Sequence, residues 1–280
     1  MAQYYNPKRS ADWNYGGSKF KLSRSKIELF MKCPRCFYID NKLGVARPRS
    51  FPLNLNSAVD KLLKKEFDIH RAEKSLHPLM DSYGLDLVPF DHKDMDTWRE
   101  VFEGVQYFHE PSGLTISGAV DDIWVTPKGE LVVVDYKSTS KEEQVNLDAD
   151  WQVQYKRQLE IYQWLLRRKG FKVSDTGYFV YANGRTDLEA FDGKLEFEVT
   201  LIPYTGSDKW VEGTIMDIKK CLDGGEIPAA AADCEYCRYI GAVNGCEPPK
   251  KLSAPADKAK AEPRKRQPKD EPSAGLSSLF

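Results

Sequence analysis

The sequence has no long apolar segment. No run of apolar residues approaches the roughly 20 that a helix needs to cross a bilayer. The opening stretch, MAQYYNPKRSADWNYGG, has no apolar core of the kind that a secretory signal carries. We therefore expect a cytoplasmic protein without a membrane partner.

Histidine and net charge are also scarce. The 280 residues include only four histidines, and no two of them have the His-x-x-x-His spacing of a metal site. This argues against a small-molecule metalloenzyme built on histidine. The formal net charge is −1, so the total charge indicates neither an acidic nor a basic partner. Hydrophobic residues make up 41% and charged residues 30%, which is typical of a globular chain with ample core.

Composition divides the chain into three regions. Residues 1–22 are polar and predict an irregular segment, and residues 23–247 predict the folded domain. Residues 248–280 are rich in proline, alanine and charge, and have almost nothing to bury, so we expect a disordered tail. From Lys250 to Phe280 there are eight Lys or Arg against four Asp or Glu, which makes this tail basic.

The folded region mixes helical and strand patterns. Apolar residues recur at helical spacing over 23–33, 52–71, 150–170 and 207–225. Short apolar or alternating runs predict strands over 114–125, 130–138, 176–182 and 194–204. The turn TPKG between the first two strands predicts a β-hairpin.

This hairpin brings charged residues together. If it is centred on Lys128, then Asp121 faces Asp135 with Cβ atoms about 5 Å apart. Strand alternation puts Lys137 on the same face as Asp135, while Tyr136 points to the other face together with Asp122. Two facing carboxylates repel unless a cation lies between them, and oxygen ligands of this kind suit Mg²⁺ or Mn²⁺. The alternative is an ion pair at a solvated strand end.

Four short motifs follow one another in the order found in a known family. They are an upstream helical acid at Asp60, Gly118-x-x-Asp121, Asp135-x-Lys137 and Gln158-x-x-x-Tyr162. Together they resemble the PD-(D/E)XK nuclease superfamily, in its RecB-like branch, which includes the CRISPR-adaptation exonucleases. The resemblance implies a restriction-endonuclease-like α/β fold, with a mixed central sheet flanked by helices. Many relatives have His where this chain has Asp60.

The resemblance also implies a function, which is metal-dependent cleavage of DNA in repair, recombination or foreign-DNA processing. The implied metal ligands are Asp60, Asp121, Asp135 and the carbonyl of Tyr136. The implied catalytic residues are Asp121, Asp135, Lys137, Gln158 and Tyr162. Tyr162 also fits a core position at its helical spacing. The alternative function is a DNA-binding accessory protein that kept the fold and lost catalysis.

Two Cys-x-x-Cys pairs predict a second metal site. Cys33 and Cys36 form one pair, and Cys234 and Cys237 form the other. Four thiolates fit either a zinc ion or a 4Fe–4S cluster. The resemblance implies a cluster held by one N-terminal and three C-terminal cysteines, in which Cys246 is the alternative to Cys36 as the fourth ligand. Reduced thiols in a small metal-free subdomain remain the other interpretation.

The sequence ends in LSSLF. Leu276, Leu279 and Phe280 are large apolar residues at the end of a basic tail with nothing nearby to bury them. The peptide resembles the sliding-clamp-binding motifs of replication and repair proteins, although it lacks their usual Gln. We expect either a clamp-binding peptide on a flexible tether or a plain untethered terminus.

Overall fold

The computed structural model describes residues 9–48 and 53–245. The chain divides into two units, Met1–Arg238 and Tyr239–Phe280, and every strand in the described ranges belongs to the first unit. None of the helices in those ranges is both long and apolar enough to cross a membrane. The predicted tail, with its terminal peptide, lies outside the described residues, as does Cys246.

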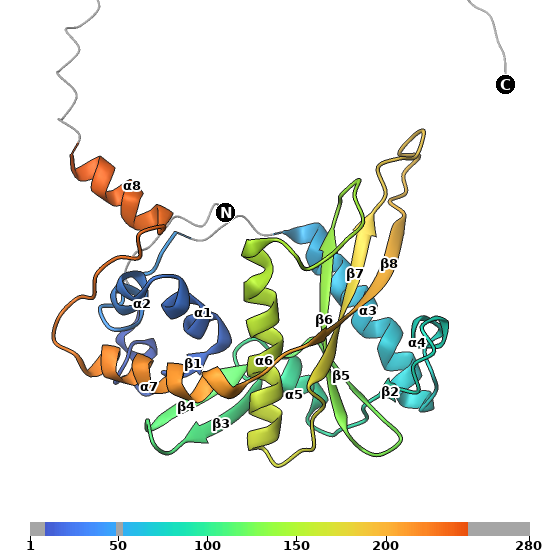
Figure 1. The fold of residues 1–280 in the computed structure, drawn as a ribbon, viewed down its shortest axis with the longest axis horizontal. Helices are drawn as coiled ribbons and strands as arrows, with labels where there is room; N and C mark the ends of the chain where they lie inside the picture. Colours follow the sequence, from blue (N-terminus) through green and yellow to red (C-terminus); the bar gives the residue numbers. More distant parts are fainter. Residues whose placement is uncertain (1–8, 49–52, 246–280) are drawn as a thin grey trace, which may run out of the picture. The chain divides into compact units, whose positions relative to one another are not determined.

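A five-stranded mixed sheet carries the predicted hairpin (Figure 1). Its order is β2-β5-β6-β7-β8, in which β6 and β7 are parallel and the other neighbours are antiparallel. The strands are β2 (Val88–Pro89), β5 (Asp122–Val125), β6 (Leu131–Thr139), β7 (Thr176–Gly184) and β8 (Phe197–Thr205). The first six residues of β6 are buried, as its apolar run predicts for a strand covered on both faces.

A second sheet has three strands, in the order β1-β4-β3. They are β1 (Leu22–Ser23), β4 (Leu114–Gly118) and β3 (Val105–His109). The single strand predicted over 114–125 is therefore wrong, because the chain leaves this sheet after Gly118 and enters the larger sheet at Asp122. Between them, Val120 is buried and its N–H donates to the carbonyl of Trp98 at 3.1 Å, which turns the segment into the core.

Helices account for most of the remaining described residues. They are α1 (Arg24–Lys32), α2 (Pro34–Asn41), α3 (Asn54–Glu73), α4 (Pro78–Ser82), α5 (Met95–Arg99), α6 (Val153–Arg168), α7 (Lys209–Asp223) and α8 (Glu235–Asn244), with short 3-10 turns at Ala11–Trp13 and Asp150–Gln152. The four helices predicted from apolar spacing are confirmed as α1, α3, α6 and α7. The mixed α/β class is likewise confirmed.

Helices cover both faces of the larger sheet, α6 on one side and α3 on the other (Figure 1). Alternate residues of β6 divide between two apolar cores. Val133 belongs to the core that includes Leu159 of α6, whereas Val132 belongs to the core that includes Phe67 of α3. Strand alternation therefore decides which helix each later residue of β6 faces.

The register of the β5–β6 hairpin agrees with the sequence prediction. Asp122 pairs with Val134, as that register requires. Gly129, with φ of +75°, supplies the left-handed residue that the tight turn needs. One position beyond β5, the same register places Asp121 opposite Asp135, at the end of the hairpin that is remote from its turn.

Candidate active site and metal centre

An open cleft of about 600 Å³ lies beside the second half of β6, between the first turns of α3 and α6. Its lining residues are Arg24, Leu53, Asn56, Ser57, Asp60, Asp121, Tyr136, Lys137, Ser138, Gln154, Tyr155 and Gln158. Five of the seven predicted active-site residues line it. The other two, Asp135 and Tyr162, are buried against Gln158 at its edge.

Asp135 is a fully buried carboxylate. One of its oxygens accepts a hydrogen bond from Nε2 of Gln158 at 2.6 Å, and the other accepts one from Nζ of Lys137. Burial raises the pKa of Asp135 to about 7, although Lys137 opposes the rise; the charge of Asp121 adds to it. The fold therefore holds a carboxylate that gains from any further positive charge brought to it.

Asp121 extends from the residue before β5 into the cleft. Oδ2 of Asp121 accepts a hydrogen bond from the backbone N–H of Tyr136 at 2.9 Å, which fixes the carboxylate beside β6. Its Oδ1 lies 3.5 Å from Nζ of Lys64, which also lies 2.9 Å from the carboxylate of Asp60. Lys64 is not among the predicted site residues, although its spacing of four residues from Asp60 on one helix signals such a contact.

Gln158 and Tyr162 lie one turn apart on α6, below the cleft. Nε2 of Gln158 donates to the Tyr162 hydroxyl at 3.1 Å as well as to Asp135. The Tyr162 ring is buried against Gly118, where an added Cβ would come within 2.7 Å of the ring. The glycine of the Gly118-x-x-Asp121 motif thus makes room for the tyrosine of the Gln158-x-x-x-Tyr162 motif. Gln158 positions the Asp135 carboxylate directly, a role that the sequence does not show.

Arg24, the first residue of α1, is a further cation of the cleft, and none of the sequence motifs contains it. Its guanidinium lies near Tyr162 and Asp135, and although burial opposes it, these two groups and Glu28 raise the pKa of Arg24. A guanidinium presents several N–H groups in one plane and suits the oxygens of a phosphate. No local pattern around Arg24 indicates this contact, because the helix that carries it meets α6 only through the tertiary fold.

The opposite face of the same hairpin holds a different set of charges. Asp122, which is fully buried, accepts hydrogen bonds from Nη2 of Arg71 and, at 3.0 Å, from Nη2 of Arg99. It also accepts one from the Tyr136 hydroxyl at 2.7 Å. The predicted division of side chains is confirmed. The Asp121 side chain turns to the cleft, while the side chains of Asp122 and Tyr136 point away from it. The positively charged partners of the Asp122 carboxylate, Arg71 and Arg99, are thus side chains of the protein itself.

The oxygen atoms at the cleft are of the kinds that bind a divalent metal ion. Asp60 and Asp121 are partly exposed carboxylates, and Asp135 adds a third whose burial favours a cation. The carbonyl of Tyr136 also reaches this side, where it lies 3.4 Å from Nζ of Lys137. Carboxylate and carbonyl oxygens are the ligands that Mg²⁺ and Mn²⁺ prefer. These four residues could therefore hold such an ion.

Residues 53–242 match the sequence profile of the PD-(D/E)XK nuclease superfamily. The chain belongs to this superfamily. Superfamily members of this type are generally nucleases that use divalent metals, which agrees with the oxygen-rich cleft. The matched range contains all seven predicted active-site residues and both cysteines of the C-terminal pair, but ends before Cys246 and begins after the N-terminal pair.

Comparison with other proteins adds little to this assignment. A solved structure described as "Crystal structure of SSO0001" is 15% identical, with a TM-score of 0.36, and the alignment covers 83% of this chain and 87% of that chain. No curated protein matches the sequence. Membership of the RecB-like branch, and the similarity to CRISPR-adaptation exonucleases, stay predictions.

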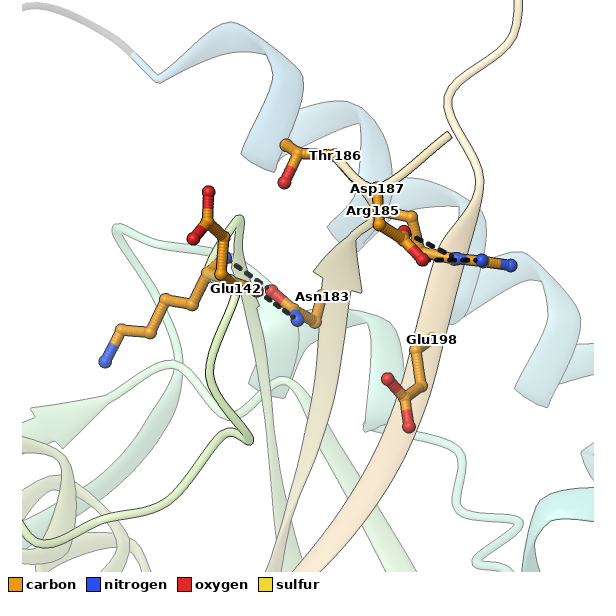
Figure 2. Close-up of a pocket in the computed structure, with 7 residues that line it drawn as sticks. Glu142, Asn183, Arg185, Thr186, Asp187 and Glu198 are labelled. Carbon is orange, nitrogen blue, oxygen red and sulfur yellow. Dashed lines mark hydrogen bonds and ion pairs between the residues drawn. The ribbon is translucent and has the colours of Figure 1, made fainter. Parts of the chain in front are cut away.

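A second cavity of this PD-(D/E)XK protein, of about 370 Å³, lies beyond the ends of β6 and β7 (Figure 2). Its lining residues are Lys141, Glu142, Asn183, Arg185, Thr186, Asp187 and Glu198. Several of their polar groups are paired within the protein. Asn183 makes two hydrogen bonds of 2.9 Å with the backbone of Lys141, and Arg185 pairs with Asp187 at 2.9 to 3.0 Å. None of the superfamily motifs contributes a residue to this cavity.

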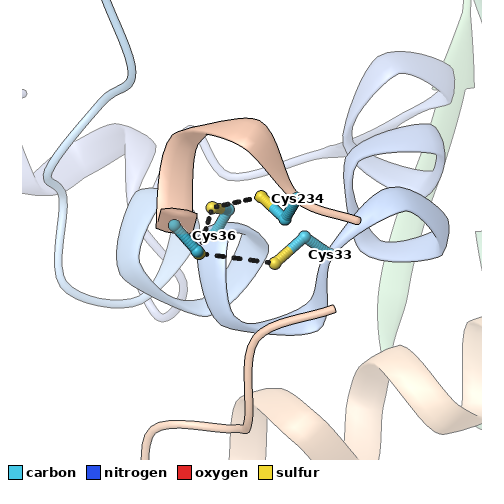
Figure 3. A group of neighbouring side chains, drawn as sticks. Cys33, Cys36 and Cys234 are labelled. Atoms are coloured by element: carbon cyan, nitrogen blue, oxygen red, sulfur yellow. Dashed lines mark hydrogen bonds between the residues drawn. The ribbon is translucent and has the colours of Figure 1, made fainter. Parts of the chain in front are cut away.

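The two Cys-x-x-Cys pairs meet, as the sequence predicts (Figure 3). The sulfur of Cys33 lies 3.8 Å from that of Cys237, and the sulfur of Cys36 lies 3.7 Å from that of Cys234 and 3.4 Å from that of Cys237. Although burial opposes it, hydrogen bonds with the backbone of Ala231 and Cys36 lower the pKa of the Cys33 thiol to about 7. The four sulfurs form a possible metal site.

Proposed function

We propose that this protein is a metal-dependent deoxyribonuclease that hydrolyses phosphodiester bonds in the cleft beside β6. The observation that carries the proposal is the meeting of Asp121, Asp135 and Lys137, which the register of the β5–β6 hairpin brings to one place. The superfamily supports nuclease activity, and the further step to DNA as substrate rests on the resemblance to DNA-processing members.

The oxygens of Asp60, Asp121, Asp135 and Tyr136 would hold Mg²⁺ or Mn²⁺. A bound ion of this kind lowers the pKa of a coordinated water and offsets the charge of a phosphate. Gln158 holds Oδ1 of Asp135 at 2.6 Å, and the Tyr136 N–H holds Oδ2 of Asp121 at 2.9 Å. Each carboxylate is thereby fixed through one oxygen, while its other oxygen faces a lysine, Lys137 for Asp135 and Lys64 for Asp121.

Lys137 is placed to act on the attacking water or on the phosphate. Its ammonium group bonds to Asp135 and lies 3.4 Å from the carbonyl of Tyr136. Its side chain is largely buried, and the charges of Asp135 and Asp121 raise its pKa against the effect of burial. The group therefore remains protonated and can donate hydrogen bonds to oxygen atoms that carry developing negative charge.

Arg24 and Lys64 complete the electrostatics of the cleft. Arg24 offers its guanidinium at the edge nearest Tyr162, where a phosphate oxygen of the DNA strand can accept from it. Lys64 lies between Asp60 and Asp121 and offsets their mutual repulsion when no metal is bound.

The position of Lys64 also favours one second function. A lysine between two acids can take the place of the ion permanently. The protein would then bind DNA as an accessory factor without cleaving it. The pathway, whether repair, recombination or foreign-DNA processing, rests on the resemblance alone. Recruitment to a sliding clamp through Leu276, Leu279 and Phe280 is likewise a proposal from the sequence.

The test is a cleavage assay with labelled single-stranded and double-stranded DNA, and with RNA of the same sequence, in Mg²⁺, Mn²⁺ or EDTA. We expect DNA cleavage that needs the metal, disappears in Asp135→Asn and persists in Asp187→Asn, a matched exposed carboxylate in the second cavity. DNA binding without cleavage in the parent protein would support the accessory function instead. Cleavage of RNA alone would overturn DNA as the substrate.

A further inference from the structure

The four cysteine sulfurs form a small cage whose size distinguishes between metal centres. Their measured separations are 3.4, 3.7 and 3.8 Å, and all four ligand atoms lie within 4.8 Å of one another. Four thiolates placed at about 2.3 Å from one zinc ion in a tetrahedron lie about 3.8 Å apart. The cage therefore has the dimensions of a single tetrahedral ion.

A 4Fe–4S cluster requires a wider cage. Each of its four thiolates binds a different iron, at a separate corner of a cube, and points away from the cluster centre. The sulfurs then stand further apart than any two sulfurs around one shared atom, and well beyond the 4.8 Å that encloses all four here. The residues in the described ranges thus do not fit the cluster that the resemblance implies.

The backbone around the two pairs explains the compact cage. Cys33 immediately precedes α2, and Cys36 lies in its first turn; Cys234 immediately precedes α8, and Cys237 lies in its first turn. The carbonyl of Cys33 accepts a hydrogen bond from the backbone N–H of Phe37 at 3.0 Å. The carbonyl of Cys234 accepts one from the backbone N–H of Arg238, also at 3.0 Å.

The two halves therefore share one local geometry. A helical turn brings residues three positions apart to the same side, so each pair offers two sulfurs to one point. A spacing of two residues between the cysteines is among those that structural zinc sites use. One N-terminal and three C-terminal cysteines, the arrangement implied for a cluster, would leave Cys36 without a role.

A positive charge lies beside the cage. Nη2 of Arg47 is 3.6 Å from the sulfur of Cys234, and its guanidinium lies over the ring of Tyr236 at 4.3 Å. Four thiolates around one Zn²⁺ leave two negative charges, which a guanidinium at this place partly offsets. Such partners outside the ligand set orient the ligands and commonly change metal affinity by about 10–100-fold.

We propose that Cys33, Cys36, Cys234 and Cys237 bind one Zn²⁺ in a tetrahedral all-sulfur site. The ion joins α2, near the start of the described chain, to the first turn of α8, about 200 residues later. α1 directly precedes α2 and carries Arg24 into the cleft, so the zinc site also anchors the segment that supplies this residue. Its role is structural, and the assignment of the ion does not rest on the proposed nuclease activity.

The first experiment is anaerobic purification of the full chain, followed by measurement of zinc, iron and inorganic sulfide per chain and by X-ray absorption at the metal edge. We expect a colourless protein with one zinc per chain and a single shell of sulfur ligands at about 2.3 Å. A brown protein with iron and sulfide would overturn the proposal. So would a protein with neither metal, in which four thiols react freely.

The second experiment identifies the ligands. Cys36→Ser should lose the zinc, whereas Cys246→Ser and Cys221→Ser should keep it. Arg47→Gln should keep the zinc but release it to a chelator at about 10–100-fold lower chelator concentration. If Cys36→Ser does not fold, the parent protein still decides the question. Removal of zinc from it must make four further thiols reactive, and Cys246 must not be one of them. Loss of zinc in Cys246→Ser with retention in Cys36→Ser would overturn the ligand set.

Discussion

Asp121 and Asp122 are neighbours in the sequence, yet the two faces of the β5–β6 hairpin use them in opposite ways. On the face toward α3, Asp122 accepts from Arg71, Arg99 and the Tyr136 hydroxyl. On the face toward α6, Asp121 lies opposite Asp135 with two lysines as their only cationic neighbours within hydrogen-bonding reach in the described residues.

The difference lies in how completely each buried carboxylate is compensated. Asp122 and Asp135 are equally buried, with no exposed surface. Asp122 has two guanidinium groups fixed around it, whereas Asp135 has one ammonium and one amide, and burial raises its pKa to about 7. A fold that leaves a carboxylate in this state keeps a site where an added cation is stabilising. Functional sites commonly retain such unfavourable burial.

The largest expected effect is the loss of cleavage in Asp135→Asn. The amide has nearly the same shape but removes the negative charge that the ion needs. We expect the rate of DNA cleavage to fall by about a thousandfold or more, because metal-bound water and charge compensation are lost together. Single-turnover assays in Mn²⁺ measure the change. A variant that cleaves at the parental rate would show that the cleft beside β6 is not the active site.

The matched substitution on the other face should act on stability instead. Asp122→Asn leaves two buried guanidinium groups without their carboxylate, and breaking a buried ion pair in this way costs about 3–5 kcal/mol. Urea unfolding measures the free energy of unfolding of the variant. The molecules that remain folded should still cleave DNA. Normal stability together with lost cleavage would mean that the roles of the two aspartates are reversed.

Much of this comparison could be predicted from the sequence. The alternation of β6 and the turn at Gly129 suffice to fix which residues of the hairpin face each other, because strand periodicity and turn geometry are local. The same alternation correctly separates Asp121 from Asp122. Local patterns likewise predict the main helices and the pairing of the two Cys-x-x-Cys segments.

The remainder depends on contacts between distant elements. The break after Gly118 arises because Val120 bonds to Trp98, and nothing near Val120 in the sequence signals that partner. Arg24 reaches the cleft only because α1 lies against α6. Lys64 differs, because its spacing from Asp60 on one helix could have revealed it.

The pH dependence of stability sharpens the comparison next. The pKa of Asp135 is raised to about 7 in the folded protein, so the folded chain keeps a proton that the unfolded chain releases near pH 4. The metal-free parent should therefore lose stability as the pH rises from about 4 to 7, by at most about 1.4 kcal/mol per pH unit. Asp135→Asn should lack this loss. Urea unfolding in EDTA at several pH values compares the two, and parallel curves would contradict the raised pKa.

Removal of the Arg24 guanidinium should have a smaller effect, and we expect it mainly in the affinity for DNA. Arg24→Met removes a guanidinium that we expect to contact phosphate, and a hydrogen bond to a charged group contributes about 1.5–3 kcal/mol. We expect KM for DNA to rise by about 10–100-fold, with a smaller change in kcat. Arg24→Lys should restore part of the affinity because it keeps the charge. An unchanged KM in Arg24→Met would reduce Arg24 to a structural partner of Tyr162.

The smallest effect separates the ring of Tyr162 from its hydroxyl. The ring fills the space beside Gly118, so Tyr162→Phe should fold normally. The hydroxyl accepts from Gln158, which in turn holds Asp135, and a neutral hydrogen bond contributes about 0.5–1.5 kcal/mol. If that contact positions the carboxylate, the variant should need a higher Mn²⁺ concentration for half-maximal cleavage, by about 2–10-fold. Gln158→Ala should raise this Mn²⁺ concentration by a similar factor. The double variant with Tyr162→Phe should raise it little further, because both changes disrupt one chain of contacts. Two independent, fully additive shifts would show that Tyr162 does not act through Gln158.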